Sequence, residues 1–259
     1  RSIHEHTQAA FEVIVVDDAS ADGSPVTIRE MFPGVRVIVQ PERRGFSAAC
    51  NAGIRNSEAP LVLLLNSDII LTDNAIDRMI AFMRQSGAAA CGSRLIAPDG
   101  SPQVYSTKVP QLGDVMRAAL GSRTAPDESP QSGGPQEVEC LQGSCMMIRR
   151  QAIEQAGLFD EGFFLYCEDI DWCIRARAAG LGLFYLPDIV MIHHRGLSTS
   201  RDVWRLTLQY HLSLWRLYRK HFARQHNLFV SIFAGVGLTA RCLATLGLNL
   251  LRKNKRPRW

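Results

Sequence analysis

Residues 61–68 read Leu-Val-Leu-Leu-Leu-Asn-Ser-Asp, an apolar run of five residues that ends in a polar turn. Such an uninterrupted run predicts a strand buried on both faces, as the strands of parallel sheets are. Similar patterns surround it, and we predict strands at 11–16, 35–39 and 61–65, with helices at 25–31, 46–56 and 73–85. Strands that alternate with helices predict an α/β fold, in which helices flank a mostly parallel central sheet.

The second half of the chain follows a different pattern. Short strands are predicted at 89–95, 138–141 and 145–148, and the Pro-, Ser- and Gly-rich residues 121–136 predict a mobile surface loop. The remaining predicted elements are a helix at 170–179, a strand at 182–186, an amphipathic helix at 204–222 and an apolar segment at 228–251. We therefore expect an α/β domain at 1–200 and a C-terminal helical appendage at 201–259.

Charge is distributed unevenly along the 259 residues. Five of the last eight residues are basic, and subtracting them from the net charge of +4 leaves −1 for the rest. A near-neutral body with a basic tail argues against a nucleic-acid-binding protein and suits an anionic membrane surface. The seven cysteines include no Cys-x-x-Cys pair, which indicates reduced, buried cysteines rather than zinc ligands or disulfides.

Carboxylates stand at the ends of two predicted strands. Asp17 and Asp18 follow the strand at 11–16, and Asp68 follows the strand at 61–65. Ligands of open α/β sheets bind beyond the carboxyl ends of the strands, so these residues are candidate ligand contacts. One carboxylate together with substrate phosphates commonly holds Mg²⁺ or Mn²⁺, which makes Asp68 the stronger candidate. The alternative is that each carboxylate only caps its own turn.

An acidic triplet follows an apolar stretch in the second half of the chain. Residues 163–167 read Phe-Phe-Leu-Tyr-Cys and precede Glu168, Asp169 and Asp171. An apolar wall disfavours the charged form of a carboxyl and raises its pKa, as a general base requires. The alternative is that the acids stabilise the first turn of a helix, whose dipole lowers their pKa values. The sequence leaves both readings open.

Two further segments carry candidate ligands. His193 and His194 follow an apolar strand pattern at 189–192, where an imidazole would suit Mn²⁺ beside Asp68. The alternative is an ordinary surface or core histidine. Gly143 and Ser144 precede a predicted buried strand, where the backbone would approach a sugar or phosphate closely or simply turn.

Six short motifs along the chain resemble those of family 2 glycosyltransferases, most closely bacterial rhamnosyltransferase-like members. They are Val-Asp-Asp-Ala-Ser-Ala-Asp-Gly-Ser at 16–24, Gly-Phe-Ser-Ala-Ala-Cys-Asn-Ala-Gly at 45–53, Leu-Leu-Asn-Ser-Asp at 64–68, Gly-Ser-Cys-Met-Met-Ile-Arg-Arg at 143–150, Gly-Leu-Phe-Asp-Glu at 157–161 with Phe-Leu-Tyr-Cys-Glu-Asp-Ile-Asp at 164–171, and His-His-Arg-Gly-Leu-Ser at 193–198. The resemblance extends over about residues 1–220 and implies the GT-A nucleotide-diphosphosugar transferase fold.

The resemblance also implies a role for each matching residue. Asp169 would be the catalytic base, with Glu168 and Asp171 on the acceptor side. Asp68 would hold a Mg²⁺ or Mn²⁺ ion, with His193 as a late ligand of the metal or diphosphate. The nucleotide-binding residues would be Asp17, Asp18, Gly45, Asn51 and Asn66, of which Asn66 stands where the metal motif commonly has its first acid.

These roles imply an inverting, metal-dependent enzyme that transfers a sugar from a nucleotide-diphosphosugar, such as dTDP-rhamnose, to a glycan or lipid-linked acceptor in bacterial cell-surface polysaccharide synthesis. The chain departs from the family pattern at two places. Arg43 and Arg44 replace the Asn-x that commonly precedes the glycine of the second motif, and the opening strand of the family would lie before Arg1. The alternative function is therefore a non-catalytic sugar-nucleotide or glycan-binding module.

The segment at 228–251 is long enough to cross a bilayer, but Arg241 stands near its middle. One alternative is a helix or helical hairpin packed on the catalytic domain. The basic residues that follow, at 252–258, favour attachment to an anionic surface. We expect a cytoplasmic enzyme attached peripherally to the inner face of the plasma membrane.

Overall fold

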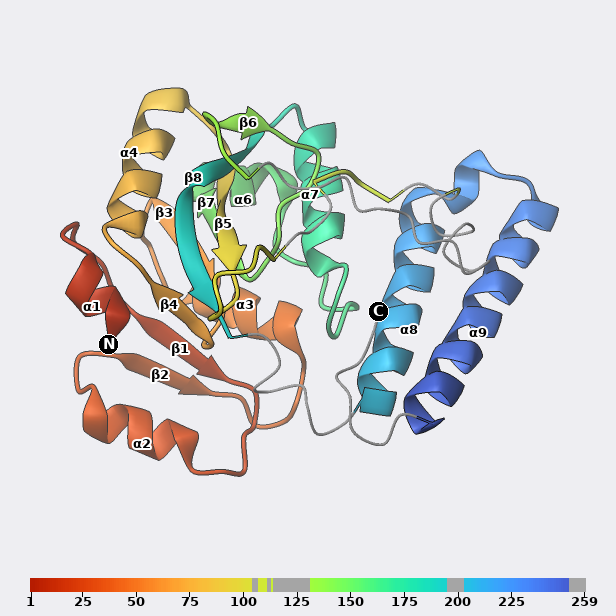
Figure 1. Ribbon diagram of the computed structural model, residues 1–259, viewed down its shortest axis with the longest axis horizontal. Coiled ribbons are helices and arrows are strands. Elements are labelled where there is room, and N and C mark those ends of the chain that lie inside the picture. Colours follow the sequence, from red (N-terminus) through yellow and green to blue (C-terminus); the bar gives the residue numbers. More distant parts are fainter. Residues whose placement is uncertain (104–106, 111–112, 114–130, 195–202, 252–259) are drawn as a thin grey trace.

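The computed structural model describes residues 1–103, 107–110, 113, 131–194 and 203–251 (Figure 1). Most of the predicted mobile loop at 121–136 lies outside the described residues. Six buried cysteines and the half-buried Cys50 are all free, as the sequence predicts.

The N-terminal part of the chain alternates helices and strands as predicted. Its elements are α1 (Ser2–His6), β1 (Ile14–Asp17), α2 (Ser24–Met31), β2 (Arg36–Val39) and α3 (Phe46–Arg55). β1 and β2 pair in parallel and form a two-stranded sheet of their own, with Ile14 opposite Arg36 and Asp17 opposite Val39. Among the described strands, β1 pairs with β2 alone.

The central sheet contains six strands. They are β3 (Leu61–Leu65), β4 (Ile69–Leu71), β5 (Ala90–Ile96), β6 (Gln136–Glu137), β7 (Cys145–Arg149) and β8 (Leu183–His193). The order is β3-β7-β5-β8-β4, and β6 also pairs with β8. Only β5 and β8 pair in parallel; the β3–β7, β5–β7, β4–β8 and β6–β8 pairs are antiparallel.

The expectation of a mostly parallel sheet was therefore wrong, because the central sheet is mixed. β3, β5 and β8 run one way, while β4, β6 and β7 run the other. The apolar composition of β3 and β7 reports burial on both faces, which is independent of strand direction. The prediction also missed β4 and the helix α6 (Arg150–Ala156), and it placed the strand β6 two residues late.

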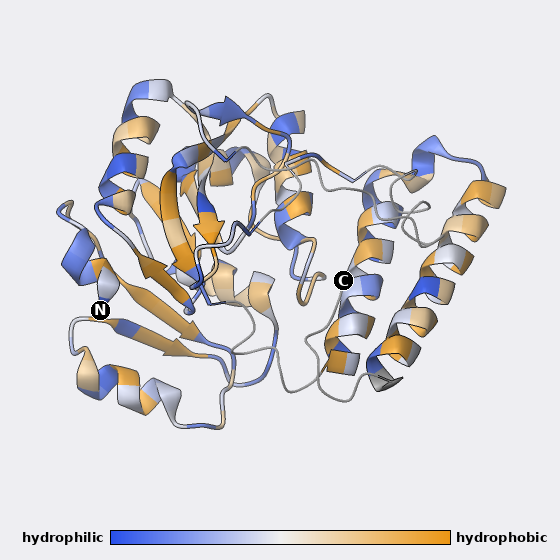
Figure 2. Ribbon diagram, viewed as in Figure 1, coloured by the Kyte–Doolittle hydropathy of each residue, from blue (hydrophilic) through white to orange (hydrophobic). Residues whose placement is uncertain are grey.

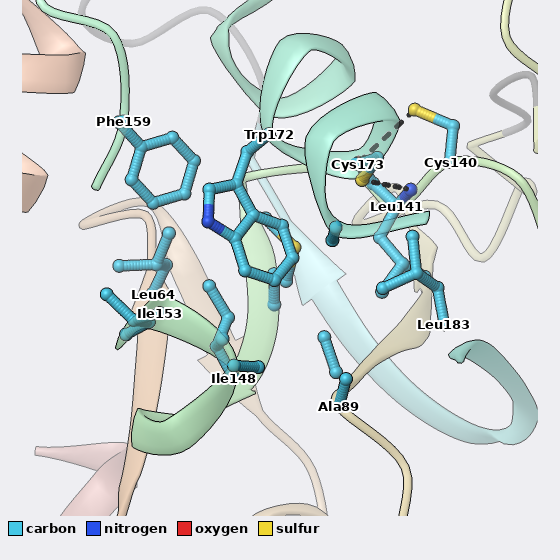
Figure 3. Packing of buried hydrophobic residues seen from close by; sticks show 14 of the residues in the cluster. Leu64, Ala89, Cys140, Leu141, Ile148, Ile153, Phe159, Trp172, Cys173 and Leu183 are labelled. Carbon is cyan, nitrogen blue, oxygen red and sulfur yellow. Dashed lines mark hydrogen bonds between the residues drawn. The ribbon is translucent and has the colours of Figure 1, made fainter. Parts of the chain in front are cut away.

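Helices cover both faces of the central sheet (Figure 1). One core cluster joins the sheet to α6 and α7 (Glu168–Ala178), with the fully buried Trp172 at its centre. The Trp172 ring lies beside that of Phe159 (Figure 3), and the two rings stack with centroids 6.1 Å apart. The Trp172 indole nitrogen donates to the Gly157 carbonyl at 3.0 Å. A second cluster packs the other face against α4 (Ala75–Ser86), through Met79 and Met83.

Two antiparallel helices, α8 (Val203–His221) and α9 (Leu228–Leu251), stand beside the α/β body (Figure 1). A third core cluster ties α8 to the segment before α7, through Leu214, Leu217 and the buried Phe163. α9 packs on α8 through a stripe of small and aliphatic residues, Ala234, Leu238 and Cys242, which are all buried. Both helices match the predicted spans within one residue at each end.

Candidate active site

The short segment Asn66–Asp68 crosses the carboxyl edge of the central sheet. It leaves β3 at one end of the strand order and enters β4 at the other. The Asn66 amide donates to the Ser144 carbonyl at 2.9 Å, and the His194 amide donates to the Asp68 carbonyl at 2.9 Å. The crossing therefore carries Asp68 to the end of β8, where His193 stands.

Asp68 and His193 lie side by side, as the sequence predicts. Asp68 Oδ1 is 3.1 Å from His193 Nε2, and their side chains are 14% and 6% exposed. The hydrogen bond from His193 lowers the pKa of Asp68 and outweighs the opposing effect of burial, so the carboxylate is ionised at neutral pH. The other ring nitrogen of His193, Nδ1, lies 3.0 Å from Gln103 Oε1.

These residues fit a divalent cation that also binds a diphosphate. Among the described residues, no group of three His, Cys, Asp or Glu side chains converges on one point. Mg²⁺ and Mn²⁺ in phosphate-binding sites commonly use one or two protein ligands and take the rest from the substrate and water. A carboxylate and an imidazole nitrogen that face each other meet this requirement. The buried Ser144 hydroxyl beside the crossing has no hydrogen-bond partner among the described residues.

Asp169 contacts Gly143, the neighbour of the Ser144 that accepts a hydrogen bond from Asn66. Its Oδ2 accepts a hydrogen bond from the Gly143 amide at 2.9 Å, and its Oδ1 accepts one from the Ile170 amide at 2.9 Å. Burial raises the pKa of the Asp169 carboxyl, although these two amides oppose it. The segment 143–144 thus contacts Asp169 through Gly143 and, through Ser144, the segment 66–68 that carries Asp68 to His193. We call this edge of the sheet the rim.

Gly143 lies close to two side chains of the protein. A Cβ at this position would lie 3.4 Å from both the Asp169 Cβ and Phe46 Cε1, a tight van der Waals contact. The Gly143 amide is aimed at the Asp169 carboxylate. The approach of the Gly143 backbone to a sugar or phosphate stays a prediction.

Glu168 and Asp171 have opposite surroundings. Glu168 is 5% exposed, its Oε2 has no partner among the described residues, and burial with the nearby Asp169 charge raises its pKa well above the usual value. Asp171 is fully buried and receives hydrogen bonds from Arg175, Lys220 and His221 at 2.7–3.0 Å. Burial disfavours its charge, but these partners outweigh it and lower the pKa of Asp171 to about 2.

The expectation that Asp171 faces the acceptor is therefore corrected. All of its described partners are on α7 and α8, and its side chain is not exposed to a ligand. It anchors the C-terminal helices to the first turn of α7. The sequence did not predict this role, because the basic partners Lys220 and His221 lie about 50 residues away and no local pattern indicates that they pair with Asp171.

Asp17 and Asp18 organise the loop that leads to α3. Asp17 is 8% exposed, and its Oδ2 accepts a hydrogen bond from the Ser20 amide at 2.9 Å. Asp18 receives the amides of Arg44 and Gly45 at 2.7 and 2.9 Å. Asp17 thus caps its own turn, as the capping alternative states, whereas Asp18 holds the distant residues 44 and 45 and retains further acceptor capacity for a ligand.

Gly45 and Asn51 join α3 to the segment before α7. Gly45 has a φ of +87°, and a Cβ there would lie 2.2 Å from the Phe164 carbonyl oxygen. Asn51 is 1% exposed, and its amide bonds Phe159 on both backbone groups and Glu161 at 2.8–3.0 Å. The contacts of Asn51 are internal, so in this arrangement it supports the site and does not reach a nucleotide.

Sequence comparison assigns the family. The family model for glycosyl transferase family 2 matches residues 1–157, more than half of the chain. The chain belongs to glycosyl transferase family 2. Proteins similar to it include the N-acetylglucosaminyl-diphospho-decaprenol L-rhamnosyltransferase of Mycobacterium tuberculosis, at 30% identity over 76% of this chain and 70% of the relative. The dTDP-rhamnosyl transferase RfbF of Shigella flexneri is 24% identical over 71% of this chain and 60% of the relative.

Structural comparison agrees with this assignment. The mannosyltransferase PcManGT from Pyrobaculum calidifontis, solved in complex with GDP-Man and Mn²⁺, aligns with a TM-score of 0.54. The alignment covers 95% of this chain and 67% of that chain at 17% sequence identity. The likeness shows the GT-A fold. The enzyme class follows from the family match: the chain is a glycosyltransferase.

Proposed function

We propose that this glycosyltransferase is an inverting, metal-dependent rhamnosyltransferase. Its donor would be dTDP-rhamnose, and its acceptor a glycan or lipid-linked glycan of bacterial cell-surface polysaccharide synthesis. The names of two relatives support this choice. One is named an N-acetylglucosaminyl-diphospho-decaprenol L-rhamnosyltransferase, and the other a dTDP-rhamnosyl transferase. The observation that carries the proposal is the rim on which Asp68, His193 and Asp169 stand around Gly143–Ser144.

The Asp68–His193 pair would hold the donor at its diphosphate. A bound Mg²⁺ or Mn²⁺ supplies positive charge that stabilises the diphosphate as a leaving group. Asp68 contributes a full negative charge at neutral pH, since its pKa is lowered. His193 contributes a nitrogen ligand from a nearly buried position, which keeps the ring in one place. Both side chains stand at the ends of paired strands and need little rearrangement to bind.

Asp169 would remove the proton from the acceptor hydroxyl. As the hydroxyl oxygen forms its bond to the anomeric carbon, the bond from that carbon to the diphosphate breaks. The electron pair leaves with the nucleotide diphosphate, and the proton passes to the Asp169 carboxylate. Each Asp169 oxygen accepts one amide hydrogen bond, so each keeps a lone pair for this proton. A single displacement inverts the anomeric configuration.

A transfer assay with dTDP-L-rhamnose and a prenyl-diphosphate-linked N-acetylglucosamine acceptor tests this proposal. Product should form with Mg²⁺ or Mn²⁺ and not with EDTA, and NMR of the product should show an anomeric configuration opposite to that of the donor. Retention of configuration, or equal rates with EDTA, would contradict the mechanism. Donor binding without hydrolysis or transfer would favour the non-catalytic alternative.

The C-terminal helices support attachment to a membrane surface. Leu228–Asn249 is long and apolar enough to span a bilayer, and only 17% of its apolar stretch is buried in the structure. The outward residues include Phe229, Val236 and Leu243, which are 82%, 61% and 65% exposed. Figure 2 shows the apolar colouring along α9. Arg241, the one charged residue of α9, lies over the Tyr210 ring of α8 at 5.9 Å.

This arrangement favours a helix lying at the surface over one crossing the bilayer. One face of α9 is already packed on α8, and the charge of Arg241 points to that interface, so the outward face is uncharged and apolar. Such a helix lies along the membrane surface and buries one face at the boundary between lipid headgroups and acyl chains. The basic residues at 252–258 add attraction to anionic lipids. The enzyme would thus work at the inner face of the plasma membrane.

Co-sedimentation with phosphatidylglycerol vesicles tests the attachment. The chain should pellet at low salt, and a Phe229→Ser/Val236→Ser variant should pellet much less. The matched control is Met31→Ser, which removes a similarly exposed apolar side chain from α2 (66% exposed) and should leave binding unchanged. A wild-type chain that stays in the supernatant would contradict peripheral attachment.

A further inference from the structure

The side chain of Gln103 holds His193 at two points. Its Nε2 donates to the His193 carbonyl oxygen at 2.6 Å, and its Oε1 lies 3.0 Å from His193 Nδ1. The first contact fixes the orientation of the amide, because only the NH₂ end donates to a carbonyl oxygen. The amide oxygen therefore faces Nδ1, and a ring nitrogen that faces an acceptor carries a hydrogen.

His193 Nε2 is consequently the nitrogen left for other partners. It faces Asp68 Oδ1 at 3.1 Å, and both side chains are nearly buried. A neutral imidazole binds a cation through the nitrogen that carries no hydrogen. A cation that binds here replaces the hydrogen through which Nε2 bonds Asp68. The neutral ring, with its hydrogen on Nδ1, then has its lone pair on Nε2 beside the carboxylate. The two atoms then present a nitrogen and an oxygen ligand to the same point.

The fold brings Gln103 to this place by a turn after β5. Gly100 adopts a φ of +81°, and the Ala97 amide donates to the Ser101 carbonyl at 2.8 Å, which reverses the chain. The Gln103 amide then donates to the Leu95 carbonyl at 3.0 Å. Because β5 pairs in parallel with β8, the turn lies next to the carboxyl end of β8, where His193 stands.

We propose that Gln103 is a positioning residue that fixes His193 in the tautomer with its hydrogen on Nδ1, so that Nε2 is directed to the cation of the donor complex. The inference rests on the proposed function for the cation itself. Without Gln103, a neutral His193 would place its hydrogen on Nε2, because Asp68 is there to accept it. That tautomer occupies the ligand nitrogen and competes with the metal.

NMR of the ¹⁵N-labelled chain tests the tautomer directly. Two-bond ¹H–¹⁵N correlations separate Nδ1–H from Nε2–H rings, and the His193 signals are those lost in a His193→Gln variant. Nδ1 should carry a hydrogen in the wild type, both without metal and with Mg²⁺ and dTDP. In Gln103→Leu the hydrogen should move to Nε2. A wild-type His193 with no hydrogen on Nδ1 would overturn the inference.

Affinity for Mn²⁺ in the presence of dTDP, measured by electron paramagnetic resonance, gives a second readout. Gln103→Leu should weaken binding by about 10–100-fold, the range known for partners of metal-bound histidines. Gln103→Glu keeps an acceptor for Nδ1–H while losing the NH₂ donor, so it should bind Mn²⁺ close to wild type. A purely structural role for Gln103 would instead weaken both variants alike. Gln151→Leu, at an exposed position on α6, is the control.

The outcomes separate this inference from the proposed function. Equal Mn²⁺ affinity in the wild type and in Gln103→Leu, with Asp68→Ala much weaker, would overturn the role of Gln103 alone. Wild-type affinity no greater than that of Asp68→Ala would overturn the cation site and, with it, the role of Gln103. A folded Gln103→Glu variant that loses binding as Gln103→Leu does would also overturn the tautomer argument.

Discussion

Asp169 and Asp171 stand two residues apart in the first turn of α7, but they face different parts of the molecule. Asp169 lies on the rim of the sheet, bonded to two backbone amides, and burial raises its pKa. Asp171 is bonded to Arg175 of α7 and to Lys220 and His221 of α8, and these partners lower its pKa to about 2. Two aspartates of one helical turn are thus suited to different roles, Asp169 to proton transfer and Asp171 to anchoring α8 on α7.

The difference shows that the first turn of a helix does not determine the state of its carboxylates. Both residues experience the positive end of the α7 dipole, which lowers carboxyl pKa values. The surroundings decide the outcome: burial raises the pKa of Asp169 against its two amide hydrogen bonds, and cations lower the pKa of Asp171. Substitution at the two positions should therefore change different properties of the protein.

Asp169→Asn should give the largest effect. The amide keeps the shape of the side chain but cannot take the acceptor proton, so turnover should fall by about 10²–10⁴-fold. The melting temperature should change little. Transfer assays on Asp169→Asn and on the control Asp188→Asn, an exposed carboxylate on β8, check this. Near wild-type turnover in Asp169→Asn would make Asp169 a helix cap.

Asp171→Asn should act on stability instead. Removing one partner of a buried ion pair costs about 3–5 kcal/mol, and we expect about 3 kcal/mol because Arg175 and Lys220 keep some access to water. Chemical denaturation measures the loss, and turnover per folded molecule should be retained. Asp160→Asn is the control, since its partly exposed pairs with Arg216 and Lys220 should contribute less. An Asp171→Asn variant that is as stable as the wild type but inactive would contradict this assignment, because Asp171 would then act in turnover and not in stability.

Acid should break the same ion pairs of Asp171 with the basic side chains around it. The folded-state pKa of Asp171 is about 2, below the unfolded value of about 3.9, so its contribution is present above pH 4 and is lost as pH falls toward 2. The shift corresponds to about 2–3 kcal/mol of unfolding free energy. The pH dependence of unfolding in this window should be visibly shallower in Asp171→Asn. Identical profiles would show that other carboxylates control acid unfolding.

Glu168→Gln should give the smallest effect. Burial and the nearby Asp169 charge raise the pKa of Glu168 well above its usual value and favour its neutral form, which glutamine resembles. The free energy of unfolding at pH 7 should change by about 1 kcal/mol or less, the size of one net hydrogen bond. Glu161→Gln should lose more, because Glu161 is paired with Arg44 and Arg55. A larger loss at Glu168 would show that this residue is ionised.

The sequence predicts the parts of the fold and site that depend on local patterns. The helices and strands from 14 to 65, the two C-terminal helices and the meeting of Asp68 with His193 agree with the predictions. Strand direction was missed, because the apolar run in β7 is the same whichever way the strand runs.

The parts that depend on distant partners could not be predicted. Gln103 follows a Pro-Asp-Gly-Ser-Pro turn and carries no pattern of its own; only the pairing of β5 with β8 brings it to His193. Asn51 lies in a motif of the family, but its partners in the loop before α7 are found only in the folded chain. Lys220 and His221, the C-terminal partners of Asp171, likewise come close to it only in the folded chain.

The most direct test of the account compares donor binding in Asp68→Ala and Asp169→Asn by calorimetry with dTDP-rhamnose. The account predicts that Mn²⁺ strengthens donor binding in the wild type and in Asp169→Asn but not in Asp68→Ala, with all three chains melting at similar temperatures. Equal Mn²⁺-dependent donor affinity in Asp68→Ala and the wild type would contradict a cation held by Asp68 and His193.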